Sequence, residues 1–160
     1  RRREHDQRMG ETAGTHGASR GHDVSSHRRH FVLRDATGMA RDLSFPVEVV
    51  ACPTRRQRDG LARSSRNVYL TPGERAAAPV VHKALQAGAA AITAGERDPA
   101  TVRDLIAQII EAEPLAELDY AAVVDADSLT VPESLVGNLR LLAAVRFGRA
   151  RLIDNVGVPV

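Results

Sequence analysis

Apolar residues recur at helical spacing over residues 71–95 and predict an amphipathic helix there. Its start carries three local signals: Thr71 as N-cap, Pro72 in the first turn, and Glu74 in the position of a capping box. Pro79 interrupts the helical hydrogen-bond ladder, so we expect it to kink this helix. The apolar stripe is interpreted as a face that packs into a core.

A second helix and three strands are predicted after the first helix. One apolar face extends over residues 98–113, which begin with Asp-Pro and stop before a further proline. The hydrophobic period then becomes that of extended chain, and strands are expected over residues 118–125, 139–147 and 150–154. A short turn at Gly148 joins the last two. Helices and strands in separate runs are typical of α+β, so we expect a small antiparallel sheet with two packed helices.

The first third of the chain carries weaker patterns. Residues 1–30 hold seven Arg and five of the six His but almost no large apolar side chains. Such a segment cannot bury enough surface to offset its ordering entropy, so we interpret it as a disordered basic tail without a metal site. A weak helix over residues 31–43 and a buried, β-branched strand over residues 47–51 follow. Together they form a piece of an α/β pattern.

Charge and composition exclude several classes of protein. The formal net charge is +2, but residues 1–30 carry +3 and residues 31–160 carry −1, so no nucleic-acid-binding face is expected. Cys52 is the single cysteine, which excludes an intrachain disulfide and favours a reducing, cytoplasmic setting. No apolar run is long enough for a membrane-spanning helix, and the N-terminus has no apolar signal region. We therefore expect no membrane partner.

The polar segment over residues 53–70 is where chemistry is expected. It places five Arg among two Ser, one Asn and a Gly, between the short strand and the capped helix. Guanidinium groups hold phosphate oxygens in a two-pronged fork, and serine hydroxyls donate to them. Asp59-Gly60 permits a tight turn. Composition alone leaves two interpretations, a loop that closes over a polyanion and a solvated arginine-rich surface loop, and it favours the second.

Other candidate chemistry is weak. The sequence contains neither a Gly-x-x-x-x-Gly-Lys nor a Gly-x-Gly-x-x-Gly motif, and no His/Cys cluster has zinc spacing, so no metal site is expected. His82 lies on the first predicted helix and is interpreted as a surface or packing residue. Cys52 follows the short strand and is interpreted as an inert thiol. Asp119, Asp125 and Asp127 are interpreted as strand-end and turn residues rather than a carboxylate pair.

One motif within the polar segment is long and specific. Residues 59–67 read Asp-Gly-Leu-Ala-Arg-Ser-Ser-Arg-Asn, with Pro53-Thr54 and Arg56 before them and Tyr69-Leu70 after them. This string strongly resembles the pantothenate synthetase (pantoate–β-alanine ligase) family, and the similarity covers about residues 39–160. The resemblance reverses the preference for a solvated loop.

The resemblance implies a domain organisation. Residues 31–52 correspond to a remnant of the family's N-terminal α/β nucleotide-binding domain, and residues 53–160 to its C-terminal α+β domain with the Ser-Ser-Arg-Asn loop. Most of the N-terminal domain is missing, together with its His-x-Gly-His motif, its Gly-x-Lys-Asp motif and its pantoate-binding glutamines. No catalytic residue is therefore assigned, and the chain is not expected to catalyse alone. The alternative is a non-catalytic fragment or a phosphate-binding module of that enzyme.

The resemblance also implies a reaction and a set of binding residues. In this family ATP and pantoate form pantoyl adenylate and pyrophosphate, and β-alanine then attacks to give pantothenate and AMP. Carried over by position, Ser64, Ser65 and Arg66 would contact the ATP phosphates, Arg63 would lie beside them, and Arg55 would touch the nucleotide through its backbone. Mg²⁺ would come with the nucleotide, and the sequence leaves a homodimer open.

This sequence departs from the family pattern within the loop itself. Gln57 replaces a usual glutamate, and Arg55 and Arg63 stand where apolar residues are common. All three changes make the loop more positive. The added charge either helps to hold a polyanion or weakens the packing of the loop, and the sequence leaves both outcomes open.

Overall fold

The computed structural model describes residues 42–44, 46–48, 50 and 52–160. The predicted tail, and nearly all of the helix predicted over residues 31–43, lie outside the described residues. The buried strand predicted over residues 47–51 is wrong for its described members, because Val47, Glu48 and Val50 are exposed and in no strand. A β-branched run becomes a strand only beside a partner that takes up its backbone N–H and C=O groups. None of the described strands pairs with it.

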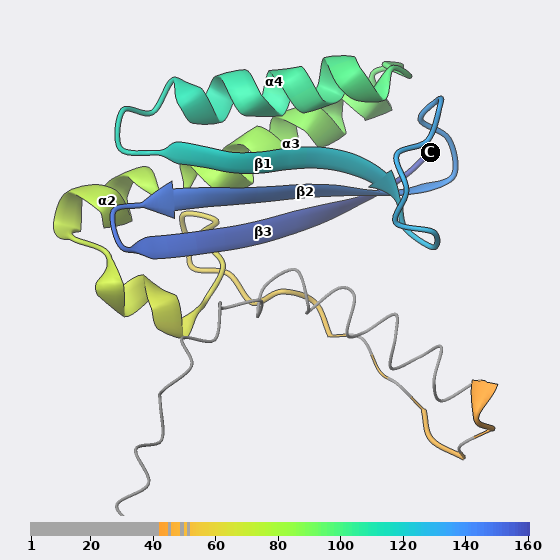
Figure 1. Ribbon diagram of the computed structural model, residues 1–160, viewed down its shortest axis with the longest axis horizontal. Helices are drawn as coiled ribbons and strands as arrows, with labels where there is room; N and C mark the ends of the chain where they lie inside the picture. Colours follow the sequence, from red (N-terminus) through yellow and green to blue (C-terminus); the bar gives the residue numbers. More distant parts are fainter. Residues whose placement is uncertain (1–41, 45, 49, 51) are drawn as a thin grey trace, which may run out of the picture.

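The described part of the chain has two layers, with helices over one face of a three-stranded sheet (Figure 1). The sheet is antiparallel and has the order β1-β2-β3. The α+β fold class with a small antiparallel sheet is therefore confirmed. The elements are η1 (Ser65–Tyr69, a 3-10 helix), α2 (Pro72–Ala77), α3 (Val80–Thr93), α4 (Pro99–Glu111), β1 (Glu117–Asp125), β2 (Asn138–Phe147) and β3 (Ala150–Pro159).

Local capping signals determine where α2 and α4 begin. Thr71 Oγ1 accepts from the Glu74 backbone N–H at 3.3 Å, and the Glu74 carboxylate accepts from the Thr71 N–H at 2.7 Å, which completes the predicted capping box. Asp98 caps α4 by accepting from the Thr101 hydroxyl and from the backbone N–H groups of Ala100 and Thr101. These bonds lower the pKa of Asp98, the Thr101 hydroxyl most of all.

Pro79 does more than kink the first predicted helix. The segment divides into α2 and α3, with Ala78 and Pro79 between them. Proline has no N–H to donate and its ring clashes with the preceding turn, so the ladder ends and starts again. The break allows α3 to change direction and lie across the sheet (Figure 1).

Strand β3 extends five residues beyond the predicted end at Asp154, to Pro159. The extension pairs with the start of β2, where Leu142 faces Asn155 and Leu139 faces Val158. Gly157 and Pro159 weaken the alternation that marks a strand in sequence. The extension is nevertheless a strand, because β2 supplies a partner for its backbone.

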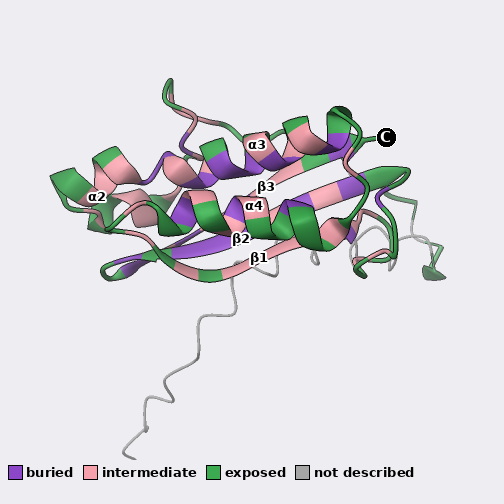
Figure 2. Cartoon of the chain, turned by 90° about the horizontal axis from the view of Figure 1, so that it is seen from above, coloured by how far each residue is buried: buried purple, intermediate pink, exposed green. Residues whose placement is uncertain are grey.

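The core lies between the helices and the covered face of the sheet, where Figure 2 shows the buried positions under α3 and α4. Alternate residues of β2 from Leu139 to Phe147 face it, together with Val102, Ile106 and Ile110 of α4. Burying each such side chain contributes about 1.5–3 kcal/mol, so aliphatic residues alone can supply a core in this aromatic-poor chain. None of the helices in the described part has the length and apolar character needed to cross a bilayer.

Candidate functional site

Residues 55–63 form a small hairpin at the start of the polar segment. The Arg63 N–H donates to the Arg55 carbonyl at 2.9 Å, and the Gln57 N–H donates to the Leu61 carbonyl at 2.8 Å. The predicted tight turn at Asp59-Gly60 is its tip, where the Gly60 N–H donates back to Gln57 and Gly60 has a φ of +92°. A side chain is disfavoured at such a φ, so this glycine permits the turn. Half of the polar segment is thus ordered by its own backbone.

The side chain of Arg56 attaches this hairpin to the edge strand β3. Its terminal nitrogens donate to the two Asp154 carboxylate oxygens at 2.5 and 2.9 Å. The same guanidinium donates to the Gly60 carbonyl at 3.1 Å and to the Asn155 carbonyl at 3.2 Å. The Asp154 side chain is only 7% exposed, and this fork places the Arg56 guanidinium beside it as its counter-ion.

Two further residues hold the tip of the hairpin. From α2, Arg75 pairs with Asp59 at 2.7 Å and donates to the Gln57 side chain at 2.5 Å. The hydrogen bond from Arg75 is the main reason that the pKa of Asp59 is lowered. From α3, the His82 ring packs against Gly60 so closely that a Cβ there would lie 2.6 Å from its Cδ2 atom.

His82 also faces the buried carboxylate, with its Nδ1 atom 3.6 Å from Asp154 Oδ2. Burial is the main cause that lowers the pKa of His82, the Arg56 charge lowers it further, and Asp154 opposes them. The ring is therefore neutral at pH 7. The Nδ1 atom is buried and makes no hydrogen bond, so its interaction with Asp154 is electrostatic.

The hairpin leads directly into the Ser-Ser-Arg-Asn turn. Ser64 caps η1, and its hydroxyl accepts from the Arg66 N–H at 3.2 Å. The Asn67 amide donates to the Ala62 carbonyl at 3.0 Å and ties the turn back to the hairpin. The Asn67 Oδ1 atom is buried and has no hydrogen-bond partner. The turn thus has a defined shape and an acceptor left for a donor.

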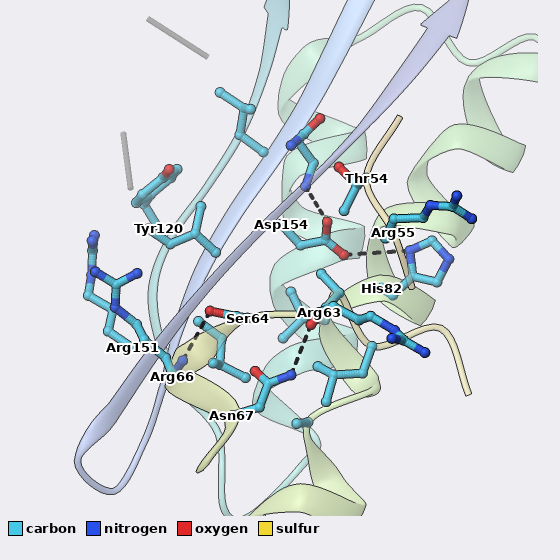
Figure 3. Close-up of a pocket in the computed structure, with 18 of the residues that line it drawn as sticks. Thr54, Arg55, Arg63, Ser64, Arg66, Asn67, His82, Tyr120, Arg151 and Asp154 are labelled. Atoms are coloured by element: carbon cyan, nitrogen blue, oxygen red, sulfur yellow. Dashed lines mark hydrogen bonds and ion pairs between the residues drawn. The ribbon is translucent and has the colours of Figure 1, made fainter. Parts of the chain in front are cut away.

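A cavity of about 390 Å³ lies between the hairpin, η1 and strand β3 (Figure 3). Four of the five residues predicted to bind a nucleotide line it: Arg55, Arg63, Ser64 and Arg66. Ser65 does not line it and is exposed at the start of η1. The backbone carbonyl of Arg55 already accepts one hydrogen bond from Arg63, which leaves one lone pair of that oxygen, the N–H and the side chain for a ligand.

The lining of this cavity carries a positive charge. Arg55, Arg63 and Arg66 contribute to it, whereas the charge of Arg151 is paired with Asp119. Asp154 is the only carboxylate among the described lining residues and is held by Arg56. Clustered guanidinium groups attract anions, and the partly apolar walls strengthen that attraction. The cavity is therefore suited to a multiply charged anion.

Sequence reasoning assigned no binding role to Arg151, His82 or Asn67, which also line the cavity. Arg151 stands in the strand predicted over residues 150–154 and reaches the cavity from β3. No signal near it in sequence marks it as a cavity residue. His82 was interpreted as a surface or packing residue; it does pack, on Gly60, but it also lines the cavity. Asn67 belonged to the family motif, but no binding role was predicted for it.

The remaining candidates have mixed outcomes. Cys52 is exposed and lines the cavity, so its placement after a buried strand is wrong. Asp119 pairs with Arg151, whose Nε atom donates to Asp119 Oδ2 at 2.6 Å. Asp125 ends β1 and accepts from Ser128 and Asp127 in the following turn, which lowers its pKa. The strand-end and turn interpretation is confirmed for Asp125 and Asp127, whereas Asp119 lies within β1 at the irregularity between Leu118 and Tyr120.

The cavity does not have the donors of a resident metal site. Among the described residues, no three His, Cys, Asp or Glu side chains gather in a way that could hold a metal ion. Guanidinium, hydroxyl and amide groups line the cavity instead, and these fit oxyanions. A divalent cation here would have to arrive already bound to an anionic ligand.

The fold and the cavity define an α+β domain that carries an arginine-lined anion pocket beside the edge strand of its sheet. The profile of the family described as Pantoate-beta-alanine ligase matches residues 30–157. The chain belongs to this enzyme family.

Individual relatives agree with the family match. The chain is 48% identical over 143 residues to the pantothenate synthetase of Geobacillus kaustophilus, which is 86% of this chain and 48% of the relative. It is also 48% identical over 122 residues to the pantothenate synthetase of Moorella thermoacetica, which is 76% of this chain and 43% of the relative. The crystal structure of pantothenate synthetase from Thermus thermophilus matches with a TM-score of 0.72 and 43% identity, over 78% of this chain and 45% of that one. The chain spans about half the length of the curated relatives it matches.

Proposed function

We propose that this chain is the phosphate-holding part of a pantoate–β-alanine ligase and that its arginine-lined cavity binds the phosphates of ATP. The observation that carries the proposal is the convergence of Arg55, Arg63, Ser64 and Arg66 on one cavity. Family membership supports the choice of ATP over other anions. Ser65 belongs to the same turn, and its exposed hydroxyl would serve a ligand that extends beyond the cavity.

The proposed reaction has two steps. The pantoate carboxylate attacks the α-phosphorus of ATP, the bond to the β-phosphate oxygen breaks, and pyrophosphate leaves. The β-alanine amine then attacks the acyl carbon of pantoyl adenylate, and AMP leaves as pantothenate forms. Negative charge grows on the phosphate oxygens in the first step. Fixed guanidinium and hydroxyl donors stabilise that charge without having to reorganise.

In this proposal Mg²⁺ accompanies the nucleotide and is held by its phosphate oxygens. The cavity supplies positive side chains and hydroxyls, so it would bind those phosphate oxygens that the cation leaves open. The chain's own contribution is to orient the triphosphate and to neutralise the departing pyrophosphate.

Isothermal titration of the chain with Mg·ATP and with inorganic pyrophosphate tests the binding. We expect measurable binding that weakens at least tenfold in R66A. The control is R103A, which removes the same charge from an exposed ion pair with Asp104 on α4, outside the cavity. Absence of binding in the parent chain, or equal binding by R66A and R103A, would refute the proposal.

A second candidate is a phosphate-binding module that does not itself catalyse. The observation in its favour is that the chain corresponds to about half of each relative. Pantoate-dependent release of pyrophosphate by the purified chain separates the two. We expect binding without turnover from these 160 residues and turnover when the part of a relative that the chain does not cover is added. Turnover by the chain alone would exclude the module.

A further inference from the structure

The residue that connects the hairpin to the sheet is not itself part of the cavity. Arg56 has no place in the cavity lining, yet its guanidinium makes four hydrogen bonds, two to Asp154 and two to backbone carbonyls. One of these carbonyls belongs to Gly60 at the hairpin tip and the other to Asn155 of β3. The Arg56 guanidinium therefore bonds to the tip of its own hairpin and to two consecutive residues of the edge strand.

Helix α3 also contacts this hairpin, at the same glycine and beside the same carboxylate that Arg56 binds. His82 packs its ring on Gly60 and directs Nδ1 toward the carboxylate that binds Arg56 (Figure 3). Residues from three segments thus meet here: Arg56 of the hairpin, Asp154 of β3 and His82 of α3. Arg75 of α2 holds the tip as well, but through the more exposed side chain of Asp59.

The hairpin determines where the phosphate-binding side chains start. Arg63 ends the hairpin through its backbone bond to Arg55, and Ser64 follows as the cap of η1. A rotation or slip of the hairpin against β3 would therefore move Arg55, Arg63 and Ser64 together. Their separation from Arg151, which β3 itself carries, would change with it.

We propose that Arg56, Asp154 and His82 form a hairpin clasp, a set of positioning residues that holds the phosphate-binding turn against β3. The clasp acts through the hairpin backbone and not through contact of Arg56 with the ligand. This inference rests on the proposed binding of ATP phosphates for its ligand, but the attachment of the hairpin can be tested without any ligand.

Simple electrostatics and the clasp make opposite predictions for D154N. Asp154 is the carboxylate of the described cavity lining, so removing its charge should tighten anion binding if charge alone matters. The clasp predicts weaker binding, because Arg56 loses the anion that fixes it. In R56K the charge is unchanged, yet the fork and the bonds to Gly60 and Asn155 are lost. The clasp predicts weaker binding there too.

The experiment measures Mg·ATP affinity and amide hydrogen exchange in the parent chain, R56K, D154N and V102A. Val102 is fully buried on α4 and lies outside both the hairpin and the cavity lining, so V102A lowers global stability without touching the clasp. We expect at least fivefold weaker binding in R56K and D154N, with faster exchange of the Gln57 and Arg63 amides that close the hairpin. V102A should leave both readouts at parent values under conditions where it is folded.

The outcomes separate this inference from the proposed function. Tighter or unchanged binding by D154N and R56K would overturn the clasp while leaving ATP binding in place. Absence of binding in the parent chain would overturn the proposed function, and the exchange data would then decide the clasp alone. Unchanged exchange of Gln57 and Arg63 in both variants would refute it.

Discussion

Arg56 and Asp154 are separated by 98 residues in sequence, yet the guanidinium of one and the carboxylate of the other meet in a two-pronged fork. The aspartate side chain is 7% exposed and the arginine 21%. Breaking such a pair costs more than forming it gains, because the remaining charge stays buried without a partner. The hairpin over residues 55–63 must therefore lie where Arg56 can reach Asp154 on β3.

The first prediction concerns the stability that depends on this pair. R56A should lower the free energy of unfolding by about 3 kcal/mol, because Asp154 is left buried without its counter-ion. Urea unfolding followed by circular dichroism measures the change. R103A, which breaks an exposed ion pair with Asp104, should cost less than about 0.5 kcal/mol. A similar loss in both variants would contradict the prediction.

The second prediction separates backbone strain from steric conflict as causes of lost stability when a glycine with positive φ is replaced by alanine. Gly60 and Gly95 have φ values of +92° and +112°, but only Gly60 has a neighbour, the His82 ring, where a Cβ would lie. G95A should cost about 1 kcal/mol from the backbone alone. G60A should cost about 3 kcal/mol, since the steric conflict with the ring adds to the backbone term.

A double-mutant cycle checks the origin of that difference. In an H82A background the cost of G60A should fall to near that of G95A, since the obstructing ring is gone. Thermal or urea unfolding of the four proteins gives the coupling. If G60A costs the same with and without the ring, the packing of His82 on Gly60 is not what restricts this position.

The third prediction is a pH dependence that originates in His82. The pKa of His82 is lowered in the folded protein, mainly by burial and then by Arg56, whereas the unfolded chain keeps the ordinary value of 6.5. As the pH falls through 6.5 the unfolded chain takes up a proton before the folded one does, so stability is lost. Above that pH the contribution of this histidine is constant.

H82N provides the test of this pH dependence, because its amide does not titrate. Urea unfolding between pH 7.5 and pH 5.5 should show a steeper loss in the parent chain than in H82N. Asp59 and Asp98 also have lowered pKa values, but the ordinary value for aspartate is 3.8, so their effects fall at lower pH. Parallel curves for the two proteins would contradict the assignment to His82.

The fourth prediction concerns the close approach of α3, α4 and the sheet at Gly88. A Cβ there would lie 2.8 Å from Ile106 Cδ1 and 2.9 Å from Leu141 Cδ2. G88A gains about 1 kcal/mol in helix propensity but overpacks the core, so we expect a net loss of about 1–2 kcal/mol. In an I106V background the loss should shrink by about 1 kcal/mol, because Cδ1 is removed. Strictly additive costs would contradict this packing.

Much of the fold was predictable because its signals are local. The Thr71 capping box and the Asp98 cap bond to groups within three residues, so a short window of sequence contains both partners. Short apolar runs bounded by polar residues also mark β1 and β2 in the sequence. The end of β3 was mispredicted, as was the strand for the described members of residues 47–51, because a strand depends on a pairing partner that its own residues do not specify.

In the candidate site, too, some residues were predictable from local sequence and others were not. Residue type and the long motif were enough to predict that Arg55, Arg63, Ser64 and Arg66 matter together, and the structure places them on one cavity. Nothing near His82 or Arg151 in sequence indicated that α3 and β3 would bring them to the same place. Their contribution comes from packing.

The sequence by itself determined the starts of α2 and α4, the turn at Asp59-Gly60, the family and the cationic character of the polar segment, because each depends on residue types within a few positions. Only the tertiary structure decided that Arg56 would be held by Asp154 and that Ser65 would lie outside the cavity. Those outcomes depend on the register of β3 and on where α3 packs against the sheet. Both are determined by contacts between distant residues, whose burial offsets the loss of chain entropy on folding. Such contacts form in three dimensions and leave no periodic trace along the chain.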